Sequence, residues 1–298
     1  MLEFQPVQLE DQEHIDRDLT HATTKNYDEC FATLYSWKDT YHAAYARTQG
    51  CLLLRLEEEG RPGFIPPVGA GDFTAAMREL MRSQKEKGEP LVMISVTDES
   101  RARLEGAFPG QFVFERRRDL DDYIHLTASL GELKGKDFHG KRGHVKKFSM
   151  LYNYEYRPMT PELVPAVLEM NTAWCRGHSY DDDDAARHEK LAAELLLRNF
   201  EALHVEGGVL LVDGRVVAAS AGTPQFSGSD TIVVHFEKGL TEYEGIYSAI
   251  CHFFMKDCSS RYTYANREED MGIPGLRKSK LSYYPELILT KYEAVWQG

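Results

Sequence analysis

Basic side chains gather near the middle of the sequence, and their spacing suits the binding of a phosphate group. Six Lys or Arg residues fall between Lys134 and Lys147, against one acid, Asp137. Apolar residues after Gly140 recur at helical intervals, which predicts a helix with most of its cations off the apolar stripe. A helix start exposes free N–H groups and a partial positive charge, and both attract an anion. The cations expected to bind it are Lys141, Arg142, Lys146 and Lys147.

A plainer interpretation of the same stretch is a solvated helix face beside acidic neighbours. Exposed ion pairs of that kind contribute little to stability. A nucleotide, a tRNA acceptor stem or a lipid head group would each supply the phosphate for the first interpretation. The stretch by itself leaves both interpretations open.

A second group of chemically useful residues stands near the end of a predicted strand. His235, Glu237 and Lys238 belong to the strand, and Glu244 and Tyr247 open the helix predicted after it. Folds that combine strands and helices often bind ligands where a strand end feeds a helix start. Glu237 is one of two carboxylates that we consider as a general base.

A third group lies beside a Gly-Pro-Gly turn close to the C-terminus. Asn266, Arg267 and Asp270 follow an aromatic strand, and Arg277 and Lys280 come after the turn. Mixed charge on a loop is a common feature of binding sites. A carboxylate here, Asp270 in particular, could orient an amine or remove its proton. A structural ion-pair network would use the same residue types, and this alternative also stays open.

The composition predicts a globular protein in a reducing, cytoplasmic setting. Of the 298 residues 42% are hydrophobic, and no run of about 18 apolar residues predicts a membrane span. The N-terminus is polar and acidic, which is not typical of a signal peptide. The five cysteines include no CxxC pair, which indicates free thiols. The formal net charge of -12 argues against general coating of nucleic acid, but it permits a local basic groove.

No metal site is predicted. The acidic run Asp181–Asp184 is interpreted as a solvated loop and a helix cap rather than as a cluster of metal ligands.

The predicted elements occur twice in the same order, which indicates an internal duplication. The hairpin predicted over 51–67 is matched with the hairpin over 209–224. Residues 30–46 are expected to form one helix, and residues 285–296 one final strand.

The duplication places the basic stretch at the seam between the two copies. We therefore expect an N-terminal domain over 1–135, a basic connecting helix over 136–152 and a C-terminal domain over 153–298.

Three stretches together carry a family resemblance that none carries alone. They are FHGKRGHVKKF from residue 138, HFEKGLTEYEGIY from residue 235 and NREEDMGIPGLRKSKLSYYP from residue 266. Together they resemble a bacterial family of uncharacterised proteins, which is similar to the soluble C-terminal domain of phosphatidylglycerol lysyltransferases. The resemblance covers residues 4–296. It implies an α+β fold of two tandem, duplicated GNAT-like domains, with central mixed sheets flanked by helices, as in the Fem-type peptidoglycan aminoacyltransferases.

The resemblance also implies a function, because relatives in this superfamily pass an aminoacyl group from charged tRNA to an amine or hydroxyl. We expect an aminoacyl- or acyltransferase whose donor is an aminoacyl-tRNA or another phosphate-bearing carrier, with Glu237 or Asp270 as the base. The residues expected to bind substrate match the family's segments: Lys141, Arg142, Lys146, Lys147, His235, Lys238, Glu244, Tyr247, Asn266, Arg267, Arg277 and Lys280.

Two departures from the family pattern limit what carries over. The lysyltransferases have a large membrane-embedded part that this sequence does not show, so the acceptor stays undefined. Acids replace the usual phosphate loop after the strand at 230–239, which disfavours acetyl-CoA. The GxG of PPVGAGDFTAAM, from residue 66, is interpreted as a plain turn. Two alternatives remain: a CoA-dependent N-acyltransferase with an unusual cofactor loop, and a non-catalytic tandem GNAT-like protein that senses a phosphorylated ligand.

Overall fold

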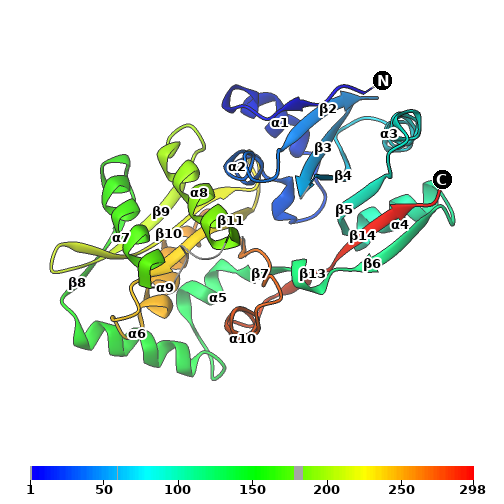
Figure 1. The fold of residues 1–298 in the computed structure, drawn as a ribbon. Helices are drawn as coiled ribbons and strands as arrows, with labels where there is room; N and C mark the ends of the chain where they lie inside the picture. The colour runs from blue at the N-terminus through cyan, green and yellow to red at the C-terminus, as the bar shows by residue number, and fades with distance from the viewer. Residues whose placement is uncertain (1, 59, 178–183) are drawn as a thin grey trace.

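The computed structural model describes residues 2–58, 60–177 and 184–298, whose strands form two seven-stranded sheets (Figure 1). The first sheet has the order β1 (Gln5–Pro6), β2 (Ala44–Thr48), β3 (Cys51–Glu58), β4 (Arg61–Val68), β5 (Val92–Thr97), β14 (Lys291–Trp296) and β6 (Phe112–Arg116). The second has the order β8 (Tyr154–Pro158), β9 (Glu206–Val212), β10 (Arg215–Pro224), β11 (Thr231–Gly239), β12 (Tyr264–Asn266), β7 (Asp122–Leu126) and β13 (Leu287–Leu289). In both sheets the fourth and fifth strands run parallel, and their other neighbours run antiparallel.

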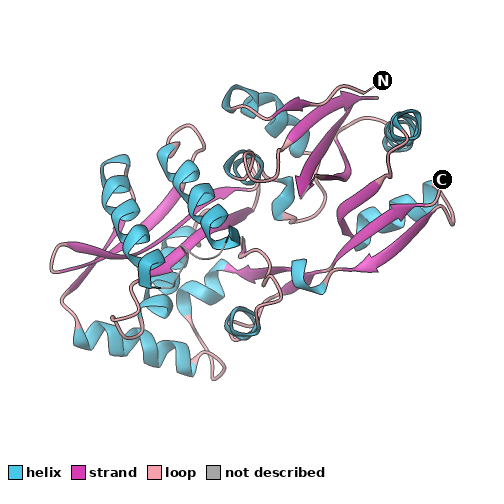
Figure 2. Ribbon diagram, in the orientation of Figure 1, coloured by secondary structure: helices cyan, strands magenta, loops and turns pink. Residues whose placement is uncertain are grey.

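The helices pack around these sheets, and Figure 2 shows the two element types. The helices are α1 (Gln12–Leu19), α2 (Phe31–Ser36), α3 (Phe73–Lys87), α4 (Asp98–Ala107), α5 (Thr127–Glu132), α6 (His139–Leu151), α7 (Val164–Gly177), α8 (Asp184–Arg198), α9 (Ile246–Cys258) and α10 (Pro274–Leu281). Short 3-10 turns are η1 (Leu9–Asp11), η2 (Tyr27–Glu29), η3 (Arg118–Leu120) and η4 (Pro161–Leu163). Two mixed sheets with flanking helices confirm the predicted fold class.

Helix α3 illustrates how the sequence sets the helix ends. The Asp72 carboxylate accepts a hydrogen bond from the N–H of Ala75, and Gly88 ends the helix with a φ of +70°. Its apolar face carries Met77 and Leu80 into the core of the first sheet. Helix α9 occupies the equivalent place in the second sheet, because each of the two follows the fourth strand.

The two halves exchange one strand each. Strand β7 comes soon after β6 in the chain, but it pairs with β12 and β13 in the second sheet. Strand β14 follows β13 after Thr290, yet it pairs with β5 and β6 in the first sheet. The predicted final strand over 285–296 was therefore wrong, since the stretch forms two strands in different sheets. The expected domains over 1–135 and 153–298 therefore differ from the two sheets at these strands: β7 lies in the second sheet and β14 in the first.

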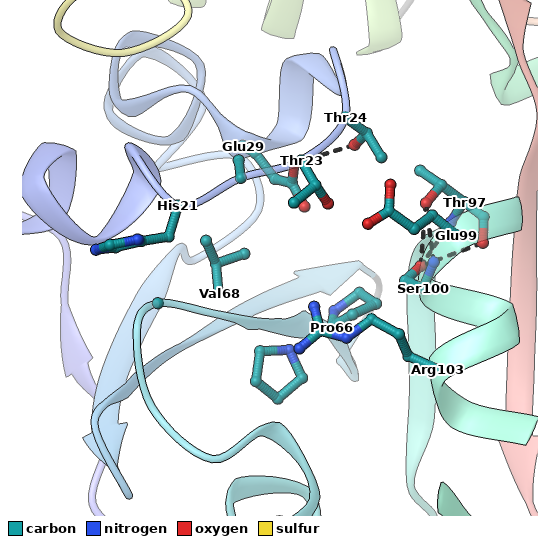
Figure 3. Close-up of a pocket in the computed structure, with 13 residues that line it drawn as sticks. His21, Thr23, Thr24, Glu29, Pro66, Val68, Thr97, Glu99, Ser100 and Arg103 are labelled. Carbon is teal, nitrogen blue, oxygen red and sulfur yellow. Dashed lines mark hydrogen bonds between the residues drawn. The ribbon is translucent and has the colours of Figure 1, made fainter. Parts of the chain in front are cut away.

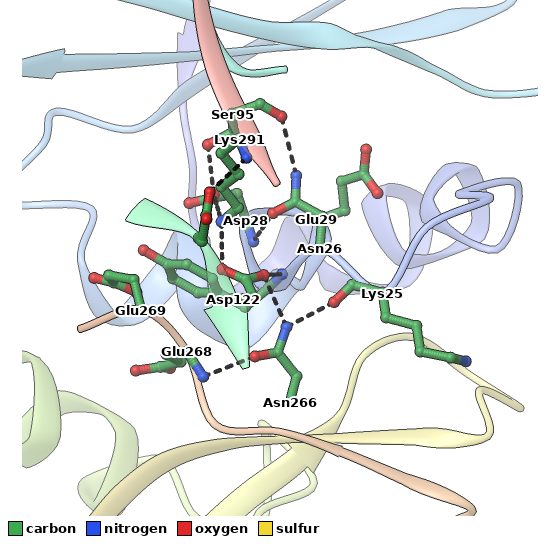
Figure 4. Close-up of polar contacts among 12 residues, drawn as sticks. Lys25, Asn26, Asp28, Glu29, Ser95, Asp122, Asn266, Glu268, Glu269 and Lys291 are labelled. Carbon is green, nitrogen blue, oxygen red and sulfur yellow. Dashed lines mark hydrogen bonds and ion pairs between the residues drawn. The ribbon is translucent and has the colours of Figure 1, made fainter. Parts of the chain in front are cut away.

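A buried lysine holds the place where the exchanged strands cross (Figure 4). Lys291 is 1% exposed, and its Nζ lies 2.7 Å from Asp28 Oδ2 and 2.7 Å from Asp122 Oδ1. Burial disfavours the charged amine, but the carboxylates of Asp122 and Asp28 outweigh it, so the pKa of Lys291 lies above its usual range. The backbone N–H of Lys291 also donates to Asp121 Oδ1 at 3.0 Å. These contacts join η2 of the first half to both exchanged strands.

Two other predictions were wrong in detail. The helix expected over 30–46 ends at Ser36, because residues 44–48 pair along their length with β3. The predicted match of the hairpin over 51–67 with the hairpin over 209–224 was wrong by one strand. By position in the sheet, β3 and β4 correspond to β10 and β11. Glu59, within the hairpin predicted over 51–67, lies outside the described residues.

Replacing Lys291 by Met should lower the free energy of unfolding by about 3–5 kcal/mol, because Asp28 and Asp122 would lose their shared cation. Urea unfolding followed by tryptophan fluorescence measures this change. Lys278→Met, at an exposed position of α10, is the control and should change stability by less than about 0.5 kcal/mol. A loss below about 1 kcal/mol for Lys291→Met would show that the crossing does not depend on this ion cluster.

Candidate functional site

The parallel strand pair at the centre of the second sheet opens into a fork. Strands β11 and β12 pair only as far as Val233 and Asn266, although β11 continues to Gly239. On the other side of β11 the register with β10 shifts beside His235, which is left as the extra residue of a β-bulge. A bulge bends its strand, so the polar residues beyond Asn266 face those beyond Val233 across an unpaired gap in the ladder.

Two side-chain pairs bridge the fork where the backbone hydrogen bonds end. Arg267 Nη2 donates to Glu237 Oε1 at 2.6 Å, and His235 Nδ1 lies 3.2 Å from Glu268 Oε1. Glu268 has a left-handed φ of +57°, and its N–H donates to Asn266 Oδ1 at 2.7 Å in a local turn. The fork thus brings together the second and third groups of residues that the sequence singled out.

The Glu237–Arg267 pair is buried and keeps unused hydrogen-bonding capacity. The two side chains are 13% and 10% exposed. Among the described residues, Glu237 Oε2 and Arg267 Nη1 find no hydrogen-bond partner. Burial disfavours the charge on Arg267, but the Glu237 carboxylate outweighs it, so the pKa of Arg267 lies above its usual range. A buried acceptor and a buried donor side by side suit a ligand that offers both functions.

Lys141 approaches this pair from helix α6. Its Nζ lies 3.7 Å from the centre of the Tyr283 ring, and the Arg267 guanidinium lies 4.8 Å from the same ring. Burial and the charge of Arg267 lower the pKa of Lys141. Both cations therefore lie against the same aromatic ring, and Lys141 turns inward toward the fork.

The other three predicted phosphate ligands do not converge on Lys141. Arg142 donates to the backbone carbonyls of Leu133 and Gly135, which fastens the turn between α5 and α6. Lys147 forms an exposed ion pair with Glu244, the residue of the second group that precedes α9. Lys146 faces solvent. On helix α6, Lys141 therefore points inward and Lys146 points outward. Arg142 and Lys147 make contacts within the fold.

Asp270 does not fit the base role that the sequence suggested. Its carboxylate accepts two hydrogen bonds from Arg277, both at 2.8 Å, one from Arg118 at 3.1 Å and one from Tyr123 at 2.6 Å. A further bond comes from the N–H of Gly272. Burial raises the pKa of Asp270, but these donors outweigh it and hold the pKa well below its usual range. A carboxylate held so strongly in its ionised form is a poor proton acceptor, and the ion-pair interpretation describes it better.

Three predicted residues remain: Lys280, which supports the third motif, and Lys238 and Tyr247, which both contact Trp174. Lys280 donates to the backbone carbonyls of Arg267 and Glu269, and so holds the third motif in place. Lys238 lies 2.9 Å from Glu189 and 4.0 Å above the Trp174 ring.

Tyr247 belongs to the same cluster as Lys238. Its hydroxyl accepts a hydrogen bond from Trp174 Nε1 at 2.6 Å. Lys238 and Tyr247 thus both contact Trp174 of α7, and Lys238 also contacts Glu189 of α8.

Sequence reasoning missed the residues that complete the surroundings of His235. The Thr223 hydroxyl lies 3.0 Å from His235 Nε2 and 3.4 Å from Cys30 Sγ. Cys30 belongs to the first half of the chain, so no local spacing could have placed it beside β11. The five cysteines lie buried, and no disulfide joins any of them in the described part of the chain.

Two hollows lie near these strands. A small pocket opens at the fork of the first sheet, between the ends of β4 and β5, with Val68, Thr97 and Arg103 in its wall (Figure 3). A cleft of about 1080 Å³ separates α1 from the loop that follows β10. Its lining includes Phe31 and Thr223, and therefore both halves of the chain.

Within residues 2–58, 60–177 and 184–298, no group of three or more His, Cys, Asp or Glu residues could hold a metal ion. Residues 178–183, and with them most of the acidic run, lie outside the described residues. No helix of the described chain combines the length and the apolar character needed to cross a membrane.

Comparison with known proteins identifies the family. The family model described as phosphatidylglycerol lysyltransferase, C-terminal, matches residues 20–295. The chain belongs to this family. A crystal structure of a conserved protein of unknown function from Bacteroides thetaiotaomicron is 36% identical, covers 100% of both chains and superposes with a TM-score of 0.95.

More distant solved structures share the fold. The structure of L-PGS from Bacillus licheniformis is 15% identical and covers 89% of this chain and 91% of its own, with a TM-score of 0.63. FemX is 10% identical over 98% and 96% of the chains, with a TM-score of 0.60. A tandem GNAT protein from the clavulanic acid biosynthesis pathway is 11% identical over 99% and 98%, with a TM-score of 0.52. These likenesses agree with the tandem GNAT-like architecture that the duplicated sheets display.

Asp270→Asn should lower the free energy of unfolding by about 2–3 kcal/mol at neutral pH, because Arg277 and Arg118 would lose the charge they share. The folded-state pKa of Asp270 is lowered, so its contribution is present above the ordinary value of 3.8 and declines as the pH falls below it. Urea unfolding at pH 7 and pH 3 measures both effects. Asp39→Asn, at an exposed position, is the control. Unchanged stability of Asp270→Asn at pH 7 would reopen the base role.

Glu29, in the wall of the small pocket, should make stability depend on pH in the opposite sense. Burial raises the pKa of Glu29 to about 8 from an ordinary value of 4.5. The stability that it contributes is therefore complete below pH 4.5 and lost as the pH rises through 8. Glu29→Gln should remove this loss between pH 5 and pH 9 in urea unfolding. Glu99→Gln, on an exposed side chain of the same pocket, should keep the slope of the natural protein.

Proposed function

We propose that this protein transfers an aminoacyl group from an aminoacyl-tRNA, or a similar phosphate-bearing carrier, to an amine or hydroxyl acceptor. The observation that carries the proposal is the buried Glu237–Arg267 pair, with Oε2 and Nη1 unpartnered among the described residues. Membership of the phosphatidylglycerol lysyltransferase C-terminal family supports the acyltransferase class.

The chemistry of the pair fits an aminoacyl ester better than a simple acyl group. Such an ester presents an ammonium group beside its carbonyl, separated by a single carbon atom. Glu237 Oε2 can accept a hydrogen bond from the ammonium, and Arg267 Nη1 can donate one to the carbonyl oxygen. The guanidinium then stabilises the negative charge that develops on that oxygen during attack. An acetyl group has no ammonium and would leave the Glu237 carboxylate without a use.

Direct transfer is the simplest reaction for this arrangement. The acceptor amine or hydroxyl attacks the ester carbonyl carbon, the bond from that carbon to the ribose oxygen breaks, and the proton that the acceptor loses passes to the departing ribose oxygen. Orientation and charge stabilisation can supply the rate enhancement without a covalent intermediate. Of the two carboxylates suggested as the base, Asp270 is committed to Arg277 and Arg118, whereas Glu237 keeps Oε2 for the ammonium of the donor.

Helix α6 carries one cation beside the fork and another on the surface. Lys141 faces the Tyr283 ring beside Arg267, while Lys136 and Lys146 are exposed to solvent. Lys141 and Lys146 are about 7.5 Å apart along the helix axis, from a rise of about 1.5 Å per residue. A carrier could therefore place phosphates on the outer cations while its aminoacyl end reaches the inner one.

The N-termini of α3 and α9 each follow the fourth strand of a sheet, where GNAT enzymes usually bind the pyrophosphate of CoA. Both N-termini are blocked in this protein. At α9, a side chain on Gly245 would meet the His144 carbonyl at 2.4 Å, so α6 covers this helix start. At α3, the Asp72 carboxylate already occupies the cap, and a negative charge there repels an anion. These contacts support a carrier other than acyl-CoA.

Filter binding with aminoacylated and deacylated tRNA tests the role of the pair. The natural protein should prefer the aminoacylated form by about tenfold, the worth of one buried hydrogen bond to a charged group. Glu237→Gln should remove this preference and leave the affinity for deacylated tRNA unchanged. Glu242→Gln, an exposed acid before α9, is the matched control. Equal binding of both tRNA forms by the natural protein would contradict the proposal.

A second binding experiment tests the outer surface of α6. Lys146→Glu should weaken tRNA binding and reduce the slope of log affinity against log salt concentration by about one, since one phosphate contact is lost. Lys87→Glu, at the exposed end of α3, changes the net charge equally and should leave the slope intact. The same slope in both variants would exclude Lys146 from the contact surface.

A further inference from the structure

A cysteine of the first half and a histidine of the second half belong to one polar chain that the proposed transfer reaction does not use. Cys30 precedes α2, and His235 is the bulged residue of β11. The Thr223 hydroxyl joins them, at 3.4 Å from Cys30 Sγ and 3.0 Å from His235 Nε2. His235 Nδ1 continues the chain to Glu268 Oε1 at 3.2 Å. A thiol, an imidazole and a carboxylate thus follow one another across the boundary between the halves.

Cys30 and His235 are both buried, yet each favours the charged form of the other. Cys30 is 1% exposed, and the side chain of His235 is 7% exposed. Burial raises the pKa of the Cys30 thiol, but hydrogen bonding and the charge of His235, with the Thr223 hydroxyl, outweigh it, so the pKa lies below its ordinary value. Burial lowers the pKa of His235, but Cys30 and Glu268 raise it to about 9.

The environment of Cys30 differs from that of three other buried cysteines. Burial raises the pKa of Cys51, and it raises the pKa values of Cys251 and Cys258 to about 12. An unreactive thiol is expected where burial dominates, whereas a thiol beside an imidazolium reacts as the thiolate. Cys51, Cys251 and Cys258 can therefore serve as internal controls for the reactivity of Cys30.

We propose that Cys30 is a modification site, at which the thiolate paired with the His235 imidazolium is oxidised to a sulfenic acid by a small hydroperoxide. The thiolate attacks one peroxide oxygen, so an S–O bond forms and the O–O bond breaks. Sulfur loses two electrons and the peroxide gains them. The departing hydroxide takes a proton from the His235 imidazolium and leaves as water, which balances the charge of the pair.

The large cleft provides the approach for a small oxidant and excludes a large one. Phe31, Thr223 and Pro224 line this cleft of about 1080 Å³. Cys30 Sγ lies directly behind two of them, 3.4 Å from the Thr223 hydroxyl and 3.8 Å from the Pro224 carbonyl oxygen. Cys30 does not itself line the cleft, so an oxidant that enters the cleft must pass Phe31 or Thr223 to reach Sγ.

Peroxide labelling of the whole protein tests this site. The folded protein is treated with hydrogen peroxide and dimedone, and mass spectrometry follows each cysteine separately. Cys30 should be labelled at least about tenfold faster than Cys51, Cys251 and Cys258, as expected for a thiolate among protonated thiols. Polyethylene glycol maleimide should leave Cys30 unmodified until urea unfolds the chain.

Two variants separate the proposed partner from a general effect on folding. His235→Asn should slow the labelling of Cys30 about tenfold and leave the other cysteines unchanged. His139→Asn, at an exposed position of α6, is the matched control. If His235→Asn does not fold, Thr223→Val removes the bridging hydroxyl alone and should slow Cys30 by a smaller factor.

Equal labelling rates for the cysteines, or labelling of Cys30 only at urea concentrations that unfold the chain, would overturn the proposal. An aminoacyl thioester on Cys30 after incubation with aminoacyl-tRNA would also overturn it, because Cys30 would then be a nucleophile of the transfer reaction. Failure of tRNA binding would leave the labelling result unaffected, so the two proposals stand or fall separately.

Discussion

The ion cluster of Lys291, Asp28 and Asp122 is the interaction on which the rest of the structure depends. The two sheets each borrow a strand from the other half, so the chain must cross between them twice at one place. The crossing segments bring charged side chains into the interior, where each needs an opposite charge. Burial raises the pKa of Asp122 to about 6 even against the attraction of Lys291, which shows how strongly this place excludes water. Lys291 neutralises both carboxylates and thereby fixes the start of β7 relative to β14.

The fork in the second sheet is an immediate consequence of this cluster. Asn266, the last paired residue of β12, donates one hydrogen bond to Asp122 Oδ2 at 2.9 Å and accepts another from the N–H of Glu268. The strand that ends at the cluster therefore turns there, and Arg267 and Glu268 point back toward β11. The bulge at His235 supplies the matching bend on the other strand. The geometry of the candidate site therefore depends on the ion cluster at the crossing, because Asn266 contacts both.

The duplicated halves have diverged in what they do with the same position. In the first sheet the fork encloses a small pocket, and the chain itself caps the helix start beside it with Asp72. In the second sheet the fork contains the Glu237–Arg267 pair, and α6 covers the helix start. The basic connector therefore acts partly as a wall: Arg142 fastens it, Lys141 reaches inward and Lys146 stays outside. The first fork therefore contains a small pocket, whereas the second contains a buried ion pair.

The sequence by itself determined the local elements and the residue types of the site. Asp72 and Gly88 bound α3, the Asp213-Gly214 turn joins β9 to β10, and three short motifs pointed to the family. Only the tertiary structure decided that residues 285–296 divide between two sheets, because periodicity gives a strand its faces but not its partner. It also separated Glu237, whose Oε2 finds no partner among the described residues, from Asp270, whose two oxygens both accept hydrogen bonds. Both are acids near turns in the sequence, and only burial and neighbours that are distant in the chain distinguish them. The contact of Cys30 with Thr223 and His235 has the same origin, since the energy of a polar group depends on what surrounds it in space.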